Sequence, residues 1–206
     1  MNAALEAALS QSGLQARPSP GAMARVEQYL ELRSRWSQTH NIAGPRSRSG
    51  AGWTDVLDGV AVWTALHPTL ALVDVGAGSG VPGLVVAAIE PEREIHLVEP
   101  LAKRSAFLRT VVRVLDLGAV RVHRTRWPCD VGVDHQVASR AVVSPEAWPD
   151  LARSGGDTVR SVLRLLARKR PPAGLDAWTL EAAVDYQVDE VSRRVERWDR
   201  PDLLAD

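Results

Sequence analysis

The stretch VDVGAGSGVPG, residues 73–83, decides the fold of this chain. It ends an apolar run at 70–75 that has the length of a buried strand, and it leads into an apolar segment at 82–89 that predicts a helix. Glycines at such a junction let the chain turn sharply and let a ligand approach the backbone closely. We therefore expect a ligand over the carboxyl end of the first strand, beside the start of the helix.

The segments that follow alternate between strand and helix patterns. Further strands are predicted at 95–98, 120–123, 136–139 and 159–167, and a helix at 103–117 that Gly118 ends as a cap. This order predicts an α/β fold with right-handed crossovers and a doubly wound parallel sheet covered on both faces. The tail at 182–198 alternates apolar and polar residues, which indicates one or two antiparallel edge strands.

The segment before the first strand has helical periodicity. Apolar positions recur at three and four within 25–36 and again within 54–66, where Thr54 is placed to cap the second helix. The intervening stretch Gly44–Gly52 is rich in glycine, serine and arginine and predicts a mobile loop. We expect one domain over 1–206, with a helical cap at 1–68 and a cofactor-binding core at 69–206.

Composition excludes several classes of protein. The 206 residues (22.4 kDa) include 25 basic and 25 acidic ones, so a uniformly basic nucleic-acid coat or a polybasic membrane-surface protein is excluded. The single cysteine, Cys129, excludes an internal disulfide and a cysteine-rich zinc cluster. With no apolar run long enough to span a bilayer and no signal peptide, we expect a cytoplasmic monomer without membrane contact or metal.

The neutral total hides an uneven distribution of charge. Residues 101–170 carry 14 basic and 6 acidic residues, a net charge of +8, whereas the segments on both sides are acidic. The basic side chains expected to track nucleic-acid phosphates are those of the helix at 103–117, namely Lys103, Arg104, Arg109 and Arg113. A merely solvated helix face is an equally good explanation of the same residues.

Two features of the glycine stretch favour S-adenosylmethionine over a dinucleotide as its ligand. The spacing is G-x-G-x-G, whereas a dinucleotide site typically has G-x-G-x-x-G and holds a pyrophosphate at the helix start. Asp74 precedes the first glycine by two residues and can accept from the methionine amine. Glu99 ends the second predicted strand and can accept from both ribose hydroxyls of a nucleoside, which indicates a bound nucleoside instead of a tight turn without a ligand. A nicotinamide-dependent oxidoreductase is disfavoured further because no Tyr-x-x-x-Lys appears.

Four sequence motifs, taken in order along the chain, resemble those of a known family. In order, VDVGAGSGVPG, LVEP at 97–100, KRSAFL at 103–108 and SRA at 139–141 resemble the RsmG (GidB) family of small-subunit ribosomal RNA guanine-N7 methyltransferases. Trp36, Asn41 and Asp58 also match that family, and the resemblance covers about residues 25–170. It implies a class I S-adenosylmethionine-dependent methyltransferase fold, methyl transfer to a guanine N7 in 16S ribosomal RNA, and that RNA or the small subunit as partner.

The resemblance also implies site residues. Gly76 and Val81 would line the cofactor, Thr125 and Arg126 would border its adenine, and Arg140 would lie at the edge of the cleft. The full set expected at the cofactor is Asp74, Gly76, Gly78, Gly80, Val81, Glu99, Thr125, Arg126 and Arg140. Two departures are an arginine, Arg126, where the family usually has an acidic residue, and Arg168-Lys169 where it commonly has Lys-Gly.

The chemistry implied by the resemblance requires no general base. Guanine N7 carries a lone pair and is itself the nucleophile, so the protein only aligns the reactants and excludes water. No catalytic residue is therefore expected, and Arg140 would position a phosphate, guanine O6 or the cofactor carboxylate. Two alternatives stay open: a methyltransferase of the same fold that acts on a small molecule, and a degenerate cofactor-binding homologue with little activity.

Overall fold

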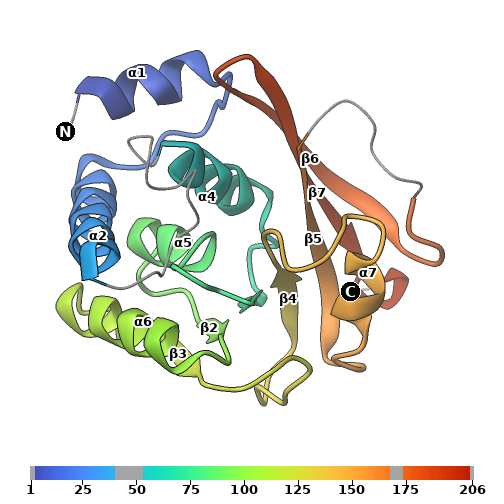
Figure 1. Cartoon of the computed structure of the whole chain (residues 1–206). Coiled ribbons are helices and arrows are strands. Elements are labelled where there is room, and N and C mark those ends of the chain that lie inside the picture. The colour runs from blue at the N-terminus through green and yellow to red at the C-terminus, as the bar shows by residue number, and fades with distance from the viewer. Residues whose placement is uncertain (1–2, 40–52, 168–173, 205–206) are drawn as a thin grey trace.

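The computed structural model describes residues 3–39, 53–167 and 174–204, and a seven-stranded sheet runs through it (Figure 1). The strands are β1 Ala71–Val75, β2 Ile95–Val98, β3 Val120–His123, β4 His135–Ala138, β5 Val159–Ala167, β6 Thr179–Val188 and β7 Val191–Asp199. The helices are α1 Ala3–Gln11, α2 Pro20–Thr39, α4 Trp53–Ala65, α5 Gly83–Ile89, α6 Ala102–Val114 and α7 Trp148–Arg153, followed by the short 3₁₀ helix η1 Pro201–Leu204.

The sheet has the order β3-β2-β1-β4-β5-β7-β6. Strands β1 to β5 are parallel, which confirms the predicted doubly wound arrangement, and the strand order reverses at β1. In such sheets, ligands bind in the crevice outside the carboxyl ends of the strands at the point of reversal. The glycine stretch lies at that point. The antiparallel pairing predicted for the tail is also confirmed, but only β6 is an edge strand, because β7 pairs with both β5 and β6.

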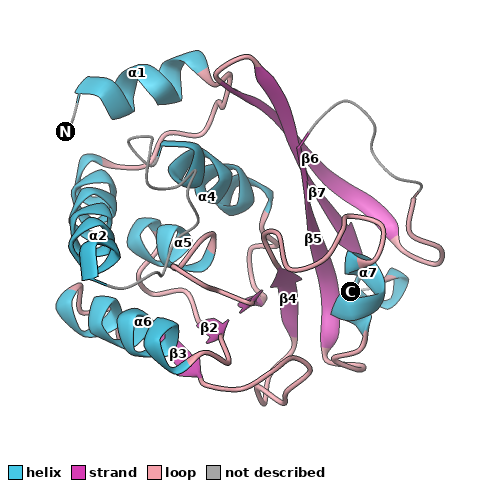
Figure 2. Ribbon diagram, viewed as in Figure 1, coloured by secondary structure: helices cyan, strands magenta, loops and turns pink. Residues whose placement is uncertain are grey.

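The two faces of the sheet are covered in different ways (Figure 2). One face packs Leu72 and Leu97 against a large apolar cluster that includes side chains of α1, α2, α4, α5 and α6. The other face packs Val73 and Val137 against α7, and against the loop at 124–134 that leads from β3 to β4. Because β1 is buried on both faces, its sequence is a continuous apolar run interrupted only by Asp74.

Helix α4 approaches α5 closely because of one glycine. A Cβ on Gly59 would lie 2.4 Å from Val85, so only glycine allows this distance between the two helices. The contact places α4 beside the helix that follows the glycine loop. Two aspartates of α4, Asp55 and Asp58, are thereby buried near the carboxyl ends of the strands.

Several predicted boundaries were wrong by a few residues. Helix α4 begins at Trp53, so Thr54 lies inside its first turn and is not its cap. Helix α6 ends at Val114 because Asp116, not Gly118, takes the left-handed conformation (φ 51°), and the N–H of Leu117 bonds the carbonyl of Val112 at 3.0 Å. Strand β4 begins one residue earlier than predicted.

Some expectations concern residues that the structure does not describe. The loop at 44–52, the family match at Asn41 and the departure at Arg168-Lys169 all lie outside the described residues. Within the described ranges, no group of three or more histidine, cysteine or acidic side chains is placed to hold a metal ion. The helices in those same ranges are all too short or too polar to cross a bilayer.

Candidate functional site

The glycine loop after β1 has the conformation that its sequence predicts. Gly76, Gly78 and Gly80 have φ values of +69°, +57° and +97°, all in the left-handed region that favours glycine. The N–H groups of Gly76 and Ala77 both bond the carbonyl of Val98 at the end of β2, at 2.8 and 3.1 Å. A Cβ on Gly78 would meet only the Gly76 carbonyl, at 3.6 Å, so the loop is open at this position.

Asp74 holds the loop from below. Its carboxylate is fully buried, and Oδ2 accepts a hydrogen bond from the N–H of Gly83, at the start of α5, at 2.9 Å. Burial raises the pKa of Asp74 to about 7, although the bond from Gly83 and the charge of Arg140 act in the opposite direction. Oδ1 has no hydrogen-bond partner in the described part of the chain. Asp74 therefore positions the loop and leaves one acceptor beneath it.

Glu99 connects the loop to the start of α6. Its buried carboxylate accepts from the N–H of Gly78 at 3.0 Å through Oε2, and from the N–H of Leu101 at 2.8 Å through Oε1. The guanidinium of Arg104 lies 3.9 Å from Oε2. Each carboxylate oxygen can accept more than one hydrogen bond, so Glu99 keeps acceptor capacity for a ligand beside Gly78. The sequence assigned both residues to the cofactor site, and the structure brings them into direct contact.

Tyr29 of α2 contacts the loop from the other side. Its hydroxyl donates to the carbonyl of Ser79 at 2.7 Å, and the guanidinium of Arg33 lies over its ring at 5.6 Å. In the sequence, Tyr29 is only one of the helically spaced positions at 25–36, and this bond was not predicted. The available signal was Arg33, four residues later on the same helix face, because a buried arginine needs a polar or charged partner.

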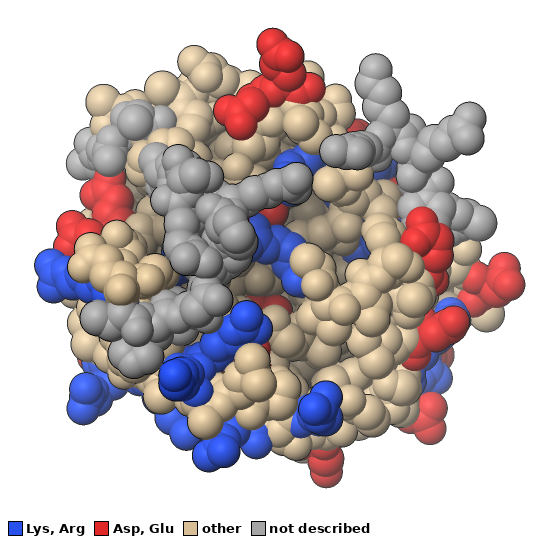
Figure 3. Space-filling view, in the orientation of Figure 1, with Lys and Arg blue, Asp and Glu red and all other residues tan. Residues whose placement is uncertain are grey.

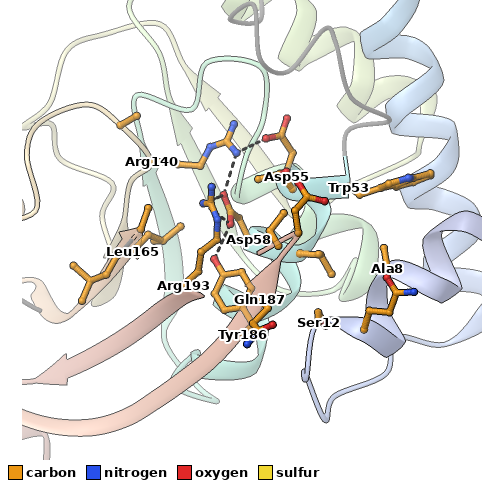
Figure 4. Close-up of a pocket in the computed structure, with 18 of the residues that line it drawn as sticks. Ala8, Ser12, Trp53, Asp55, Asp58, Arg140, Leu165, Tyr186, Gln187 and Arg193 are labelled. Atoms are coloured by element: carbon orange, nitrogen blue, oxygen red, sulfur yellow. Dashed lines mark hydrogen bonds and ion pairs between the residues drawn. The ribbon is translucent and has the colours of Figure 1, made fainter. Parts of the chain in front are cut away.

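A chain of charged side chains extends from Arg33 across the carboxyl ends of the strands, and Figure 4 shows its members Asp55, Asp58, Arg140 and Arg193. Arg33 bonds Asp55 at 2.5 Å, and Nη1 of Arg140 bonds both Asp55 and, at 3.1 Å, Asp58. Asp58 also accepts from Arg193 of β7 at 3.1 Å. Burial would raise the pKa of Asp55, but Arg140 and Arg33 outweigh it and hold that pKa below its usual value.

The hydroxyl of Tyr186, on β6, completes this group by donating to Oδ1 of Asp58 at 2.6 Å. Burial and the neighbouring Asp58 charge both raise the pKa of Tyr186, so its hydroxyl stays protonated and remains a donor. Of the residues in this group, the sequence singled out Arg140 and, through the family match, Asp58. It missed Asp55, Tyr186 and Arg193 as functional residues. Only the fold brings β6 and β7 next to α4.

A cavity of about 850 Å³ lies beside the charged group, between α4, β5 and the β6–β7 hairpin. Arg140 and Arg193 line it, together with apolar side chains such as Trp53 and Leu165 (Figure 4). Gly76, Gly78 and Glu99 do not line this cavity. The structure thus has two adjacent regions, the glycine loop at β1 and β2 and the cavity at β4 and β5, with Arg140 between them.

The remaining predicted site residues lie at the same edge of the sheet or within the loop. Val81 is buried in the loop, whereas Thr125 and Arg126 are exposed two and three residues beyond the end of β3. The end of β3 adjoins the site because the N–H of Glu99 bonds the carbonyl of His123 at 3.0 Å. Nothing in the structure brings Thr125 or Arg126 into contact with the loop glycines.

Basic side chains gather on the surface formed by α6 (Figure 3). Lys103, Arg109 and Arg113 are exposed, and Arg104 is partly buried next to Glu99. The helix therefore presents positive charge close to the glycine loop, through the start of α6. Lys103 and Arg104, at the start of α6, therefore lie near the loop, whereas Arg109 and Arg113 lie farther along the helix, toward the amino ends of β2 and β3.

The family model described as rRNA small subunit methyltransferase G, GidB, matches residues 22–155. The chain belongs to the GidB family. Its relatives named "Ribosomal RNA small subunit methyltransferase G" include one from Halorhodospira halophila, 36% identical over 61% of this chain and 60% of that protein. Another, from Stenotrophomonas maltophilia, is 33% identical over 81% of this chain and 76% of that protein. The alignment to a third, from Dichelobacter nodosus, spans 46% of that protein, so the match to some relatives covers only about half of their length.

Solved structures show the same fold for this GidB chain. The "delta-N METTL16 MTase domain" superposes with a TM-score of 0.56 over 85% of this chain and 94% of that one, at 14% identity. A mutant of MtNAS in complex with S-adenosylmethionine superposes with a TM-score of 0.55 over 88% of this chain and 77% of that one, also at 14% identity. These likenesses confirm the predicted class I methyltransferase fold.

Proposed function

We propose that this chain transfers the methyl group of S-adenosylmethionine to N7 of a guanine in 16S ribosomal RNA. The observation that carries the proposal is the bond between the N–H of Gly78 and Glu99, in a chain that belongs to the GidB family. It brings a carboxylate of β2 to the glycine loop of β1, where a nucleoside ribose finds acceptors and a close backbone.

The residues around the loop fit this cofactor. Gly76, Gly78, Gly80 and Val81 would surround it, and Glu99 would accept from the ribose hydroxyls. The open space at Gly78 supports a ligand that packs against the backbone of the loop. The unpartnered Oδ1 of Asp74 supports a ligand that also carries a hydrogen-bond donor. Thr125 and Arg126 would border the adenine, because they follow the strand next to Glu99. When bound, the cofactor supplies an electrophilic methyl group.

The protein's own contribution is to orient the acceptor and exclude water. Guanine N7 has a free lone pair, so no side chain needs to remove a proton, and none of the described site residues is assigned that role. The basic residues of α6 would hold RNA phosphates near the loop, and attraction of this kind weakens with salt. The substrate would be naked 16S ribosomal RNA or the small subunit.

Methyl incorporation tests the proposal directly. Purified protein is incubated with labelled S-adenosylmethionine and either 16S ribosomal RNA or small subunits from a strain that lacks guanine-N7 modification. We expect incorporation into one guanine, which is mapped as N7-methylguanine by mass spectrometry. A protein that binds the cofactor without transferring the group would be the degenerate homologue, and transfer only to small molecules would support the alternative substrate class.

A further inference from the structure

The cavity beside α4 is next to the glycine loop and has the size of a ligand site. Its volume is about 850 Å³, within the roughly 300–1,000 Å³ typical of small-molecule pockets. Arg140, Ala141 and Val143 line the cavity. Val142, in the same segment, lies against the glycine loop, because a Cβ on Gly76 would be 2.4 Å from its side chain. A group bound in the cavity would therefore lie next to a cofactor held by the loop.

Two arginines at the cavity are fixed in place by one carboxylate. Arg140 and Arg193 both use Nη1 to bond Asp58, whose side chain is only 1% exposed. Their own side chains are 25% and 24% exposed, more than any other member of the charged group. Because a guanidinium carries five N–H donors, both arginines keep donors that this carboxylate does not use.

The other carboxylates at the cavity do not use up the remaining N–H donors of Arg140 and Arg193. Asp55 accepts from Arg33 and Arg140, and Asp58 accepts from Tyr186 in addition to its two arginines. Asp189 is the third carboxylate that lines the cavity, and it lies exposed near the turn between β6 and β7. An anion would therefore be favoured at the end of the cavity formed by the two arginines.

We propose that this cavity receives the acceptor nucleotide and that Arg193, together with Arg140, binds the phosphate flanking the base. The proposal rests on the proposed function. Two guanidiniums anchored by a shared carboxylate match phosphate, which accepts several charge-assisted hydrogen bonds. A phosphate fits better than N7 itself, because a guanidinium against N7 would oppose the positive charge that methylation creates there.

The β6–β7 hairpin gains a role in substrate binding from this assignment. Arg193 lies beyond residues 22–155, the part of the chain that the family model matches. Its strand pairs with β5, and the register places Arg193 opposite Ala167, at the carboxyl end of β5 that faces the cavity. The hairpin therefore supplies a wall and a phosphate-binding residue that the core of the fold lacks.

Equilibrium binding to unmethylated 16S ribosomal RNA over a range of salt concentrations tests the role of Arg193. We expect Arg193→Gln to weaken RNA binding about tenfold or more, as for a lost charge-assisted contact. The slope of log affinity against log salt should become shallower by about 0.7, as for one phosphate contact to single-stranded RNA. Affinity for S-adenosylmethionine should stay unchanged, since Arg193 does not contact the loop.

Two further variants separate binding from folding. Gln187, an exposed residue, also lines the cavity, so Gln187→Lys adds a positive charge there and should tighten RNA binding and steepen the salt dependence. Arg194→Gln is the matched control, because Arg194 bonds Asp185 at 3.1 Å and does not line the cavity. Thermal unfolding of each variant identifies any loss of folded protein.

The outcomes distinguish this inference from the proposed function. If Arg193→Gln binds RNA with the wild-type affinity and salt slope, or if Gln187→Lys leaves both unchanged, the cavity does not hold an RNA phosphate. If the wild-type protein binds RNA and the variants behave as expected, but no methyl group is transferred, the proposed activity fails and the phosphate site stands. If the wild-type protein binds neither 16S ribosomal RNA nor small subunits, both are overturned.

Discussion

The carboxylate of Asp74 accepts a hydrogen bond from the backbone N–H of Gly83 at 2.9 Å, across the base of the glycine loop. This single bond joins the strand before the loop to the helix after it. Gly83 has no room for a side chain, because a Cβ would lie 2.8 Å from the same carboxylate. The shape of the loop therefore depends on a buried group that can change its charge.

That group gives the first prediction, a dependence of stability on pH. Burial raises the pKa of Asp74 to about 7 from its ordinary value of 3.8, so the folded protein binds a proton that the unfolded chain has already released. Its contribution to the free energy of unfolding is full below about pH 4 and is lost as the pH rises through 7. Asp74→Asn should remove this pH dependence of the free energy of unfolding, which amounts in total to a few kcal/mol as an order of magnitude.

Urea unfolding of wild type and variant between pH 4 and 8 checks the slope. Other groups also titrate in this range, so the quantity to follow is the difference in unfolding free energy between the two proteins. Asp116→Asn is a suitable control because Asp116 is exposed at the end of α6 and asparagine tolerates its positive φ. A constant difference between Asp74→Asn and wild type across the range would contradict the prediction.

A second prediction concerns the open space at Gly78. Gly78→Ala places a methyl group where, apart from the adjoining residues, the described part of the chain has no atom closer than the Gly76 carbonyl at 3.6 Å. This is the position expected for the cofactor. We expect the affinity for S-adenosylmethionine to fall about tenfold or more, since one extra methyl in a filled site costs about 1–3 kcal/mol. Isothermal titration measures this directly.

Gly13→Ala is the matched control for backbone strain. Gly13 also has a positive φ, +79°, and apart from its chain neighbours no described residue has an atom within 4 Å of its Cβ position. It follows α1 and is remote from the loop in the chain. Both variants should lose about 1–2 kcal/mol of stability from the left-handed backbone. Only Gly78→Ala should lose cofactor affinity, and an equal loss in both would show that the effect is strain.

A third prediction concerns how the C-terminal hairpin is held. Asp58→Asn removes the charge that Arg140, Arg193 and Tyr186 share, and it leaves buried donors without a full partner. We expect a loss of about 3–5 kcal/mol, typical of breaking a buried ion pair from one side. Relative to wild type, hydrogen exchange in the Asp58→Asn variant should accelerate more in β6 and β7 than in β1.

The same hairpin offers a control on its surface. Asp185 pairs with Arg194 at 3.1 Å, but its side chain is 70% exposed. Asp185→Asn should therefore cost no more than about 1 kcal/mol. Comparable losses in Asp58→Asn and Asp185→Asn would contradict the role assigned to burial.

Much of the sheet could be predicted from local pattern. The predicted bounds of β2, β3 and β5 agree with the structure. A strand buried within a parallel sheet, such as β2, appears as a short apolar run between turns, whereas the edge strand β3 alternates apolar and polar residues. Gly78 and Glu99 were both expected at the cofactor, and the structure joins them by a hydrogen bond that the sequence did not predict. Helix α7 was not predicted, since it has only six residues and includes Pro149.

The charged group could not be predicted, for a physical reason. Asp58 and Arg193 are 135 residues apart, and their contact depends on β7 lying between β5 and β6 instead of at the edge. An alternating tail indicates strands but not their order in a sheet. The contacts of Trp127 could not be predicted either. It follows Thr125 and Arg126, the residues expected at the adenine, but its indole donates to the carbonyl of Leu151 at 2.7 Å and its ring packs over Gly155.

A fourth prediction concerns acid, and its sign is opposite to that of Asp74. His96 Nδ1 and His123 Nε2 are 2.9 Å apart on β2 and β3, so one ring donates and the other must be neutral to accept. Burial lowers the pKa of both rings, although Glu94, bonded to His96 at 3.1 Å, acts in the opposite direction on that residue, and nearby His135 adds to the lowering. The folded protein therefore binds fewer protons than the unfolded chain, and the stabilisation present above about pH 6.5 is lost as the pH falls.

Replacing His123 tests this pair. His123→Gln keeps a side chain that can donate to or accept from His96 but removes one titrating ring. We expect the variant to match wild type near pH 8 and to lose less stability on acidification to pH 5, as measured by urea unfolding at each pH. Because protonation of the pair forces two cations together on adjacent strands, the difference should grow steadily below pH 6.5. Parallel stability curves for the two proteins would show that the histidine pair does not contribute to the acid sensitivity of the sheet.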